Sequence, residues 1–229
     1  MFDEIRRFVK SSQDDFFDLL KVYDDNLDED SKLNPEEIVY WLDNKSANRE
    51  LLIFGCYAEN RPVGYLQFSY YKKDNFACID YAACEKEHRG LKKFSYTINF
   101  IVEYFKTNYA DIDYLTTEII KYKNPAMTRL LRRLNFMIAN TLYIHPSLRS
   151  EEPKSVMNCN LLIYSYKMAP KIQKKDFLMI IKGIYDYSYI EWKKPFSEGI
   201  EYKNYISSIN GMYDEISNKL GSDEFVVLV

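Results

Sequence analysis

The 229-residue sequence has few cysteines, histidines, glycines and prolines, and it contains no long apolar run. Its four cysteines lie in or beside apolar stretches without paired spacing, which predicts buried free thiols and a reducing compartment. With His88 and His145 as the two histidines, a histidine-based metal site is not expected. No stretch approaches the length of a membrane span, and the N-terminus lacks a signal-peptide layout. We therefore expect a cytoplasmic protein without a metal or a membrane partner.

Charge and composition exclude further classes. The net charge is −3, which does not favour nucleic acid as a partner. Hydrophobic residues make up 47% of the chain and charged residues 28%, as in an ordinary globular protein. A chain of this length can form one sizeable domain, or one domain with an extension.

The central stretch of the chain reads as a strand, a basic turn and a helix. The short apolar run Phe76–Cys84 predicts a buried strand, and a compact basic turn follows it. Apolar residues at i, i+4, i+7, i+8 and i+11 then predict an amphipathic helix over Phe94–Asn108. The first turn of such a helix attracts anions because its amides lack partners within the helix. Arg89, Lys92 and Lys93 would add positive charge there.

This turn resembles the acyl-CoA-binding segment of the GNAT N-acetyltransferases, whose pattern is Arg/Gln-x-x-Gly-x-Gly/Ala. Arg89 and the following Gly90 fit that pattern. Lys92 stands where the family has its central glycine, and Phe94 occupies a position that is usually small. The pyrophosphate-binding motif is therefore degenerate.

A second segment, residues 124–136, resembles the family's Asn-x-x-Ala-x-x-Leu-Tyr-x-x-Leu-Gly-Phe with every spacing kept. Met127 stands for the alanine and Leu131 for the tyrosine. Asn124 would cap the helix, and Asn135 replaces the glycine that ends it, since asparagine tolerates the left-handed conformation. With two motifs in order, the chain is identified as resembling the GNAT superfamily over roughly residues 12 to 168.

The resemblance implies an α/β fold: a GNAT-like mixed twisted sheet flanked by helices, plus a C-terminal helical extension. Domain boundaries are expected at 1–169 for the acyltransferase-like part and 170–229 for the extension. Helices are predicted at 14–27 and from 34 onward, and strands at 51–57, 62–71, 76–84, 114–120, 137–144 and 156–168.

The extension itself has two helical stripes. These stripes lie at 177–185 and 202–220, and a loop is expected between them at 190–196. The tail 225–229 is apolar enough to require burial. Such a pair of helices packs on its own domain or on another copy, so a homodimer is the alternative to self-packing.

The resemblance also implies where coenzyme A would bind. The backbone at the end of the central strand would meet the pantetheine, and the turn with the start of the following helix would meet the pyrophosphate. Lys92 either hinders the approach of phosphate or adds a cation, and we expect binding to be retained. The expected acetyl-CoA-binding residues are Ala83, Cys84, Glu85, Arg89, Gly90, Leu91, Lys92, Lys93, Phe94, Ser95 and Asn124.

Acyl transfer to an amine also needs a base and a route for the leaving thiolate. Asp80 is the first candidate base, because a carboxylate in an apolar strand is costly unless it is paired or functional. Glu118 is the alternative, and each carboxylate could instead be a structural, hydrogen-bonded group. Leu131 cannot donate a proton, so the thiolate leaves unaided or Tyr143 serves as acid. Most of the 21 tyrosines must be packing residues.

The function expected from the resemblance is an acetyl-CoA-dependent N-acetyltransferase acting on a primary amine, either a small molecule or a peptide. The alternative is a catalytically inactive GNAT-fold protein that binds or interacts, which the substitutions at Lys92, Phe94 and Leu131 favour.

Overall fold

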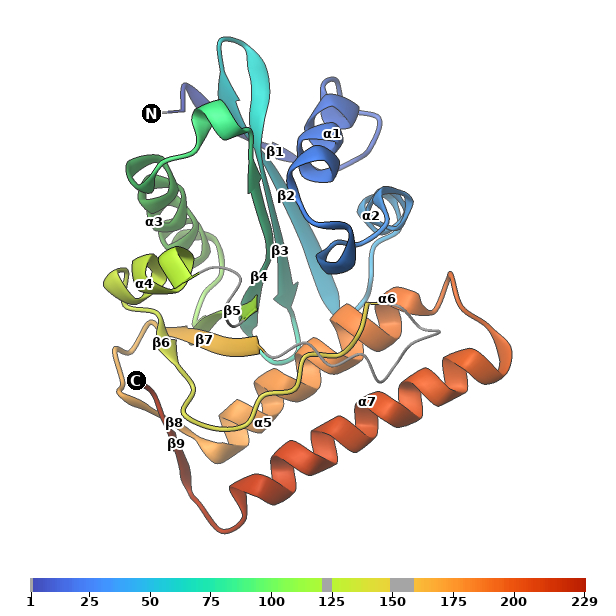
Figure 1. The fold of residues 1–229 in the computed structure, drawn as a ribbon, viewed down its shortest axis with the longest axis vertical. Coiled ribbons are helices and arrows are strands. Elements are labelled where there is room, and N and C mark those ends of the chain that lie inside the picture. The colour runs from blue at the N-terminus through green and yellow to red at the C-terminus, as the bar shows by residue number, and fades with distance from the viewer. Residues whose placement is uncertain (1, 121–124, 149–158) are drawn as a thin grey trace. The chain divides into compact units, whose positions relative to one another are not determined.

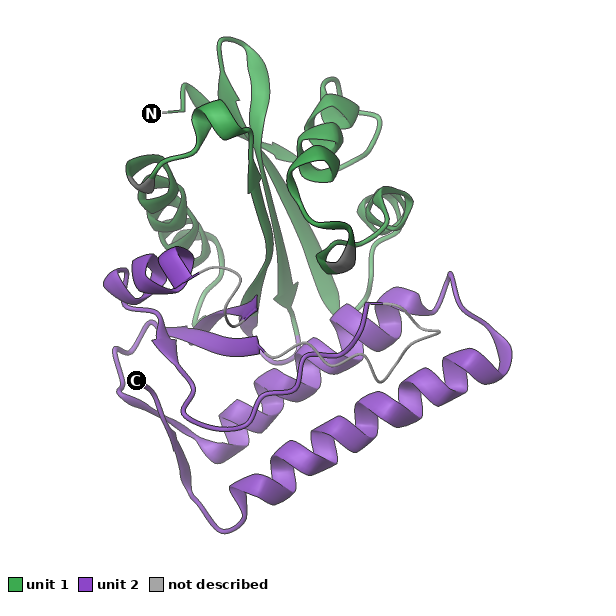
Figure 2. Cartoon of the chain, in the orientation of Figure 1, with its two compact units in different colours: residues 1–72, 77–112 green, residues 73–76, 113–229 purple. Residues whose placement is uncertain are grey.

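The computed structural model describes residues 2–120, 125–148 and 159–229. These residues form two compact units, shown in Figure 2. Unit 1 comprises Met1–Lys72 and Ala77–Ile112, and unit 2 comprises Lys73–Phe76 and Asp113–Val229. The expected domain division between residues 169 and 170 stays a prediction.

Unit 1 contains four neighbouring strands in the order β1-β2-β3-β4. The hairpin between β2 and β3 closes through Glu59 and Asn60, both at positive φ, which is the two-residue turn that matches strand twist. β1 was not predicted, because its sequence Glu-Ile-Arg-Arg-Phe has no clear alternation and only Phe8 is buried. The strands are β1 (Glu4–Phe8), β2 (Arg49–Ala58), β3 (Arg61–Tyr71) and β4 (Phe76–Cys84).

Helices cover both faces of these strands, α1 and α2 on one face and α3 on the other (Figure 1). α2 begins as predicted, because the Asn34 side chain accepts a hydrogen bond of 3.0 Å from the Glu36 amide and Pro35 takes the first position. On the α3 face, the rings of Phe68 and Phe105 pack at 5.8 Å. The helical segments are α1 (Phe16–Asn26), η1 (Glu29–Ser31), α2 (Pro35–Asp43), η2 (Lys86–His88) and α3 (Leu91–Asn108).

Unit 2 pairs its strands antiparallel, in the order β5-β7-β6 and, separately, β8-β9. Its strands are β5 (Tyr114–Ile120), β6 (Met137–Ile138), β7 (Cys159–Ser165), β8 (Lys171–Gln173) and β9 (Phe225–Val227). Its helical segments are α4 (Pro125–Arg133), α5 (Lys174–Gly183), η3 (Ile184–Ile190), α6 (Glu191–Lys193) and α7 (Gly199–Leu220). The α/β class, with twisted strands flanked by helices, is thus confirmed.

The end of α4 follows the prediction, but the strand after it does not. Asn135 has φ 66°, and the Phe136 amide donates to the Leu131 carbonyl at 3.0 Å, which closes the helix. The strand expected over 137–144 is wrong beyond Ile138, since only β6 forms. The C-terminal tail pairs here instead, with amide–carbonyl bonds of 2.7 and 2.9 Å between Ile138 and Val229. Residues 156–158 of the next expected strand lie outside the described residues.

The C-terminal region is more helical than predicted. The loop expected at 190–196 is wrong in its first half, because the chain stays helical from α5 through a π-helical segment, η3, to the end of α6. Tyr189 and Trp192 are 4% and 1% exposed, so burial of these large rings accounts for the continued helix. Burial of the tail is only partly confirmed, since Val226 and Leu228 are buried while Phe225 is exposed. One-sided burial is what a paired strand produces.

Two further expectations concern thiols and membranes. All four cysteines are free; Cys56, Cys78 and Cys159 are buried, and Cys84 is half-buried. Within the described ranges, every helix is too short or too polar to cross a bilayer.

Candidate functional site

The candidate anion site of unit 1 is the turn between β4 and α3. The single turn η2 follows β4, and Gly90 then stands directly before α3. Gly90 has φ 166°, an extended conformation that any residue adopts, and a Cβ built there meets nothing within 4 Å. The glycine is therefore not required by local packing. As the residue before α3 it has no side chain to cap the first amides, which leaves room for an external acceptor.

The contacts of Arg89 differ from the expected approach to phosphate. Its Nε donates to the Cys84 carbonyl at 2.8 Å, and its terminal nitrogen donates to the Asn26 side chain at 3.0 Å. The guanidinium thereby ties the turn to the end of β4 and to the end of α1. The Glu85 amide donates to the Val63 carbonyl at 2.9 Å. Two of the backbone groups expected to meet pantetheine thus have partners within the chain.

Glu85 is a bridging carboxylate rather than a free one. It accepts a hydrogen bond of 2.6 Å from Arg61, which lowers the Glu85 pKa below its usual value. Its second oxygen lies 3.9 Å from His88 Nε2. The charged carboxylate is therefore held at the outer side of the turn.

Lys92 and Lys93 supply the positive charge of the turn. Lys92 is exposed, and Lys93 is half-buried with its Nζ 3.3 Å from His88 Nδ1 and 5.5 Å from the centre of the Phe2 ring. Phe94 and Ser95 are also half-buried, on the first turn of α3. Helix α3 begins at Leu91, three residues before the predicted start, so its amides directly follow Gly90. Asn124, expected to cap α4, lies outside the described residues.

Cys84 and Cys56 carry thiols rather than thiolates. Burial raises the pKa of Cys56 to about 12, and burial also raises the pKa of Cys84, although Lys93 and Arg89 oppose that shift. A protonated thiol is a poor nucleophile. The raised pKa values therefore argue against either thiol acting as a nucleophile at this turn.

Asp80 lies on β4, half-exposed, and is a hydrogen-bonded carboxylate. Its Oδ2 accepts from Ser69 Oγ at 2.7 Å and from Gln67 Nε2 at 3.4 Å. Gln67 in turn accepts from the hydroxyl of the fully buried Tyr65 at 2.6 Å. Burial raises the Tyr65 pKa well above 10, and the charges of Tyr23 and Asp80 add to it. This network gives Asp80 a structural role alongside its candidacy as a base.

In unit 2 the structure brings Glu118 and Tyr143 together. The Tyr143 hydroxyl donates to Glu118 Oε1. Tyr143 is 6% exposed and lies on the irregular segment after β6, whereas Glu118 lies on β5. Burial, followed by the charge of Glu118, raises the Tyr143 pKa well above 10. A phenol with a raised pKa stays protonated and donates a hydrogen bond, and it is a weaker acid than an exposed tyrosine.

Two residues of this cluster were missed from sequence: Tyr189 and His145. The Tyr189 hydroxyl lies 3.2 and 3.3 Å from the two oxygens of Glu118 and 2.9 Å from His145 Nε2. His145 Nδ1 is buried and has no hydrogen-bond partner in the part of the chain that the structure describes. Tyr185, one turn earlier in η3, donates to the Ile144 carbonyl. π-Helical turns often mark functional sites, but nothing in the sequence distinguishes η3 from an α-helix.

Leu131 occupies the position at which the family has a tyrosine. It is 2% exposed and lies in the core on α4. A residue with an apolar, buried side chain takes no part in proton transfer.

No model of a protein family matches the sequence, and comparison with curated proteins finds no similar sequence. Solved structures do resemble it. A protein of Bacteroides thetaiotaomicron assigned to the GNAT family of acetyltransferases has a TM-score of 0.63 at 12% identity, covering 81% of this chain and 98% of that one. An N-acetyltransferase of Staphylococcus aureus Mu50 has a TM-score of 0.53 at 17% identity, covering 71% and 97%.

Arabidopsis thaliana NAA60, solved in complex with acetyl-CoA, has a TM-score of 0.50 at 14% identity, covering 72% of this chain and 99% of that one. Likenesses at such low identity establish the fold. The chain therefore has the GNAT fold, as its two motifs predicted.

Proposed function

We propose that this protein is an acyl-CoA-dependent N-acyltransferase that uses acetyl-CoA and transfers the acetyl group to a primary amine. The observation that carries the proposal is the turn from β4 to α3, where an uncapped helix start follows Gly90 beside two lysines. The resemblance to the GNAT acetyltransferases implies that coenzyme A would meet this turn, and the GNAT fold of the chain supports that assignment.

The residues of the turn fit a diphosphate. The open space at Gly90 lets an anion approach the amides that begin α3, and those amides carry partial positive charge. Lys92 adds a full positive charge. Its side chain is exposed, so it is not buried in the space beside Gly90. Arg89 acts as a positioning residue, because its guanidinium is bound to Cys84 and Asn26.

Either of two carboxylates would remove the proton from the acceptor amine. Asp80 accepts hydrogen bonds from Ser69 and Gln67, which orient its carboxylate on β4. Glu118 accepts hydrogen bonds from Tyr143 and Tyr189, and the Tyr189 hydroxyl also lies beside His145 Nε2. Tyr143 is the candidate acid for the leaving thiolate, and the acceptor remains any small-molecule or peptide amine.

Binding of acetyl-CoA is tested by calorimetric titration of the full chain. Gly90→Val should weaken binding about ten- to hundredfold, since the loss of one charge-assisted hydrogen bond to phosphate costs roughly 1.5–3 kcal/mol. Its melting temperature should not change, because the new Cβ meets open space. Gly211→Ala is the matched control: it also adds a methyl group in open space, on α7, and should bind acetyl-CoA as the wild type does.

Absence of acetyl-CoA binding by the wild-type chain would refute the transferase proposal. Binding without release of free thiol, across a panel of polyamines, amino sugars and lysine peptides, would instead favour the catalytically inactive alternative. Within an active protein, Asp80→Asn and Glu118→Gln separate the two candidate bases: the variant that loses turnover but keeps acetyl-CoA affinity identifies the base.

A further inference from the structure

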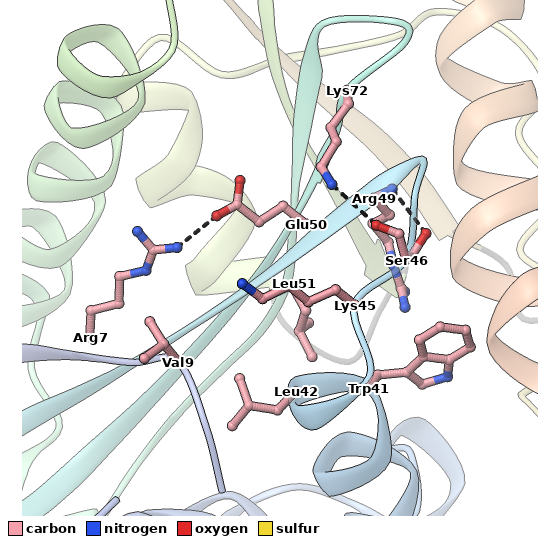
Figure 3. Close-up of a pocket in the computed structure, with 10 residues that line it drawn as sticks. All are labelled: Arg7, Val9, Trp41, Leu42, Lys45, Ser46, Arg49, Glu50, Leu51 and Lys72. Carbon is pink, nitrogen blue, oxygen red and sulfur yellow. Dashed lines mark hydrogen bonds and ion pairs between the residues drawn. The ribbon is translucent and has the colours of Figure 1, made fainter.

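Unit 1 contains a pocket of about 290 Å³, whose lining residues Figure 3 shows. Its lining comes from the end of β1, the last turn of α2 and the segment after it, the start of β2 and the residue after β3. Arg49 at the start of β2 faces Tyr71 at the end of β3, whereas the Glu85 amide binds Val63 near the other end of β3. Along that strand the two sites are on the order of 25 Å apart.

Positive side chains dominate the lining. Four cations line the pocket against one carboxylate, Glu50. Arg7 binds Glu50 at 2.7 Å and the hydroxyl of Tyr104 at 3.0 Å. Glu50 accepts a second hydrogen bond, of 3.1 Å, from Tyr109. The carboxylate is therefore engaged by Arg7 and Tyr109, while Lys45 and Lys72 add further positive charge to the lining.

The segment after α2 holds one of these lysines, Lys72, in place. The Ser46 hydroxyl accepts hydrogen bonds of 3.1 Å from the amides of both Asn48 and Arg49, and the Ser46 carbonyl accepts one of 3.1 Å from Lys72 Nζ. Lys72 keeps two further donors on its ammonium group. Lys45 is exposed and makes no hydrogen bond or ion pair within the described chain. Fixed donors bind an anion with little ordering cost.

Arg49 and Trp41 add a nearly buried side to the pocket. Arg49 is 2% exposed, and its guanidinium lies 5.2 Å from the centre of the Trp41 ring. Trp41 is 9% exposed and comes from the last turn of α2. A pocket with an apolar, aromatic side and a few cations is suited to a small organic molecule rather than to a long polymer. The net charge of −3 on the whole chain also disfavours a long polyanion such as nucleic acid as the ligand.

We propose that this pocket binds a small organic anion, one carrying a phosphate monoester or two or more carboxylates. Its volume is at the lower end for small-molecule sites, so the ligand is a compact metabolite rather than a whole coenzyme. The distance from the α3 turn makes the pocket a second site, independent of acetyl-CoA. Acyl transfer does not occur there, and the ligand acts as an effector or as an anchor.

Titration of the full chain with inorganic phosphate and with citrate, at constant ionic strength against chloride, tests the proposal. Binding is followed by the two indole N–H signals in ¹H–¹⁵N spectra, one from Trp41 and one from Trp192. The Trp41 signal should shift saturably while the Trp192 signal stays in place. The variant Lys45→Gln with Lys72→Gln should bind about tenfold more weakly, since it removes two positive charges from exposed positions without touching the core.

Lys106→Gln is the matched control, because Lys106 is exposed on the last turn of α3 and does not line the pocket. Lys92→Gln serves as the second control, since phosphate could also meet the start of α3. Both controls should leave the shift of the Trp41 signal unchanged, and the double variant should bind acetyl-CoA as the wild type does. Comparison of phosphate with citrate separates the two ligand chemistries.

Three outcomes would overturn the proposal. One is the lack of a saturable Trp41 shift with either probe. A second is equal affinity in the wild type and in the double variant, which would mean that the lysines are ordinary solvated surface charges. The third is loss of acetyl-CoA binding in the double variant, which would make the pocket part of the coenzyme site. None of these outcomes depends on whether the protein transfers acetyl groups.

Discussion

Two glycines of unit 2 should respond in opposite ways to the same substitution. Gly183 is the last residue of α5, and a Cβ built there lies 2.8 and 2.9 Å from two ring atoms of Phe76. Phe76 is fully buried, so its ring has little freedom to move. Gly211 lies within α7, where an added Cβ meets nothing within 4 Å. Both residues are helical, so replacing glycine by alanine should lower the conformational entropy cost of folding by the same amount at each.

The sizes of the two effects follow from that geometry. Replacing a helical glycine by alanine stabilises by about 0.8–1 kcal/mol, which is the whole effect expected for Gly211→Ala. At Gly183 the methyl group must gain roughly 0.7 Å of separation from the ring to reach ordinary contact, and such overpacking costs about 1–3 kcal/mol. Gly183→Ala should therefore be neutral to destabilising, and about 1–3 kcal/mol less stable than Gly211→Ala.

Urea unfolding followed by far-ultraviolet circular dichroism measures both variants against the wild type. Gly183→Ala has a second consequence, because η3 follows directly and carries Tyr185 and Tyr189. Displacement of η3 would loosen the hydrogen bonds from Tyr189 to Glu118. If Gly183→Ala stabilises the protein as much as Gly211→Ala does, the close packing of Phe76 on α5 is wrong.

Two other predictions concern the buried phenols. Burial raises the pKa of Tyr65 and of Tyr143 above 10 in the folded chain, so the unfolded chain loses these protons first. Stability should hold below about pH 10 and then fall by up to roughly 1.4 kcal/mol per pH unit for each tyrosine. Ionisation of all tyrosines at 295 nm before the chain unfolds would contradict this. Tyr189→Phe removes one donor from Glu118 and the partner of His145 Nε2, and should destabilise by about 1–3 kcal/mol in urea. An unchanged midpoint would show that water replaces the hydroxyl.

Local signals in the sequence determined several elements of the fold. The Asn34–Pro35 pair starts α2, the apolar run Phe76–Cys84 forms β4, and Asn135 ends α4 in the left-handed conformation. Each of these depends on contacts within a few residues, so spacing and residue type are sufficient. The order of the two GNAT-like motifs was enough to predict the fold.

Tertiary structure decided what depends on residues far apart in the chain. The C-terminal tail pairs with the chain at Ile138, where Ile138 and Val229 exchange two backbone hydrogen bonds. Burial of Trp192 extends α5 through η3. The same extension brings Tyr189 to Glu118, 71 residues away, and no local pattern encodes that meeting. The turn at Gly90 was visible in the sequence, but the binding of Arg89 to Cys84 and Asn26 required the folded chain, since only folding brings Asn26 to that turn.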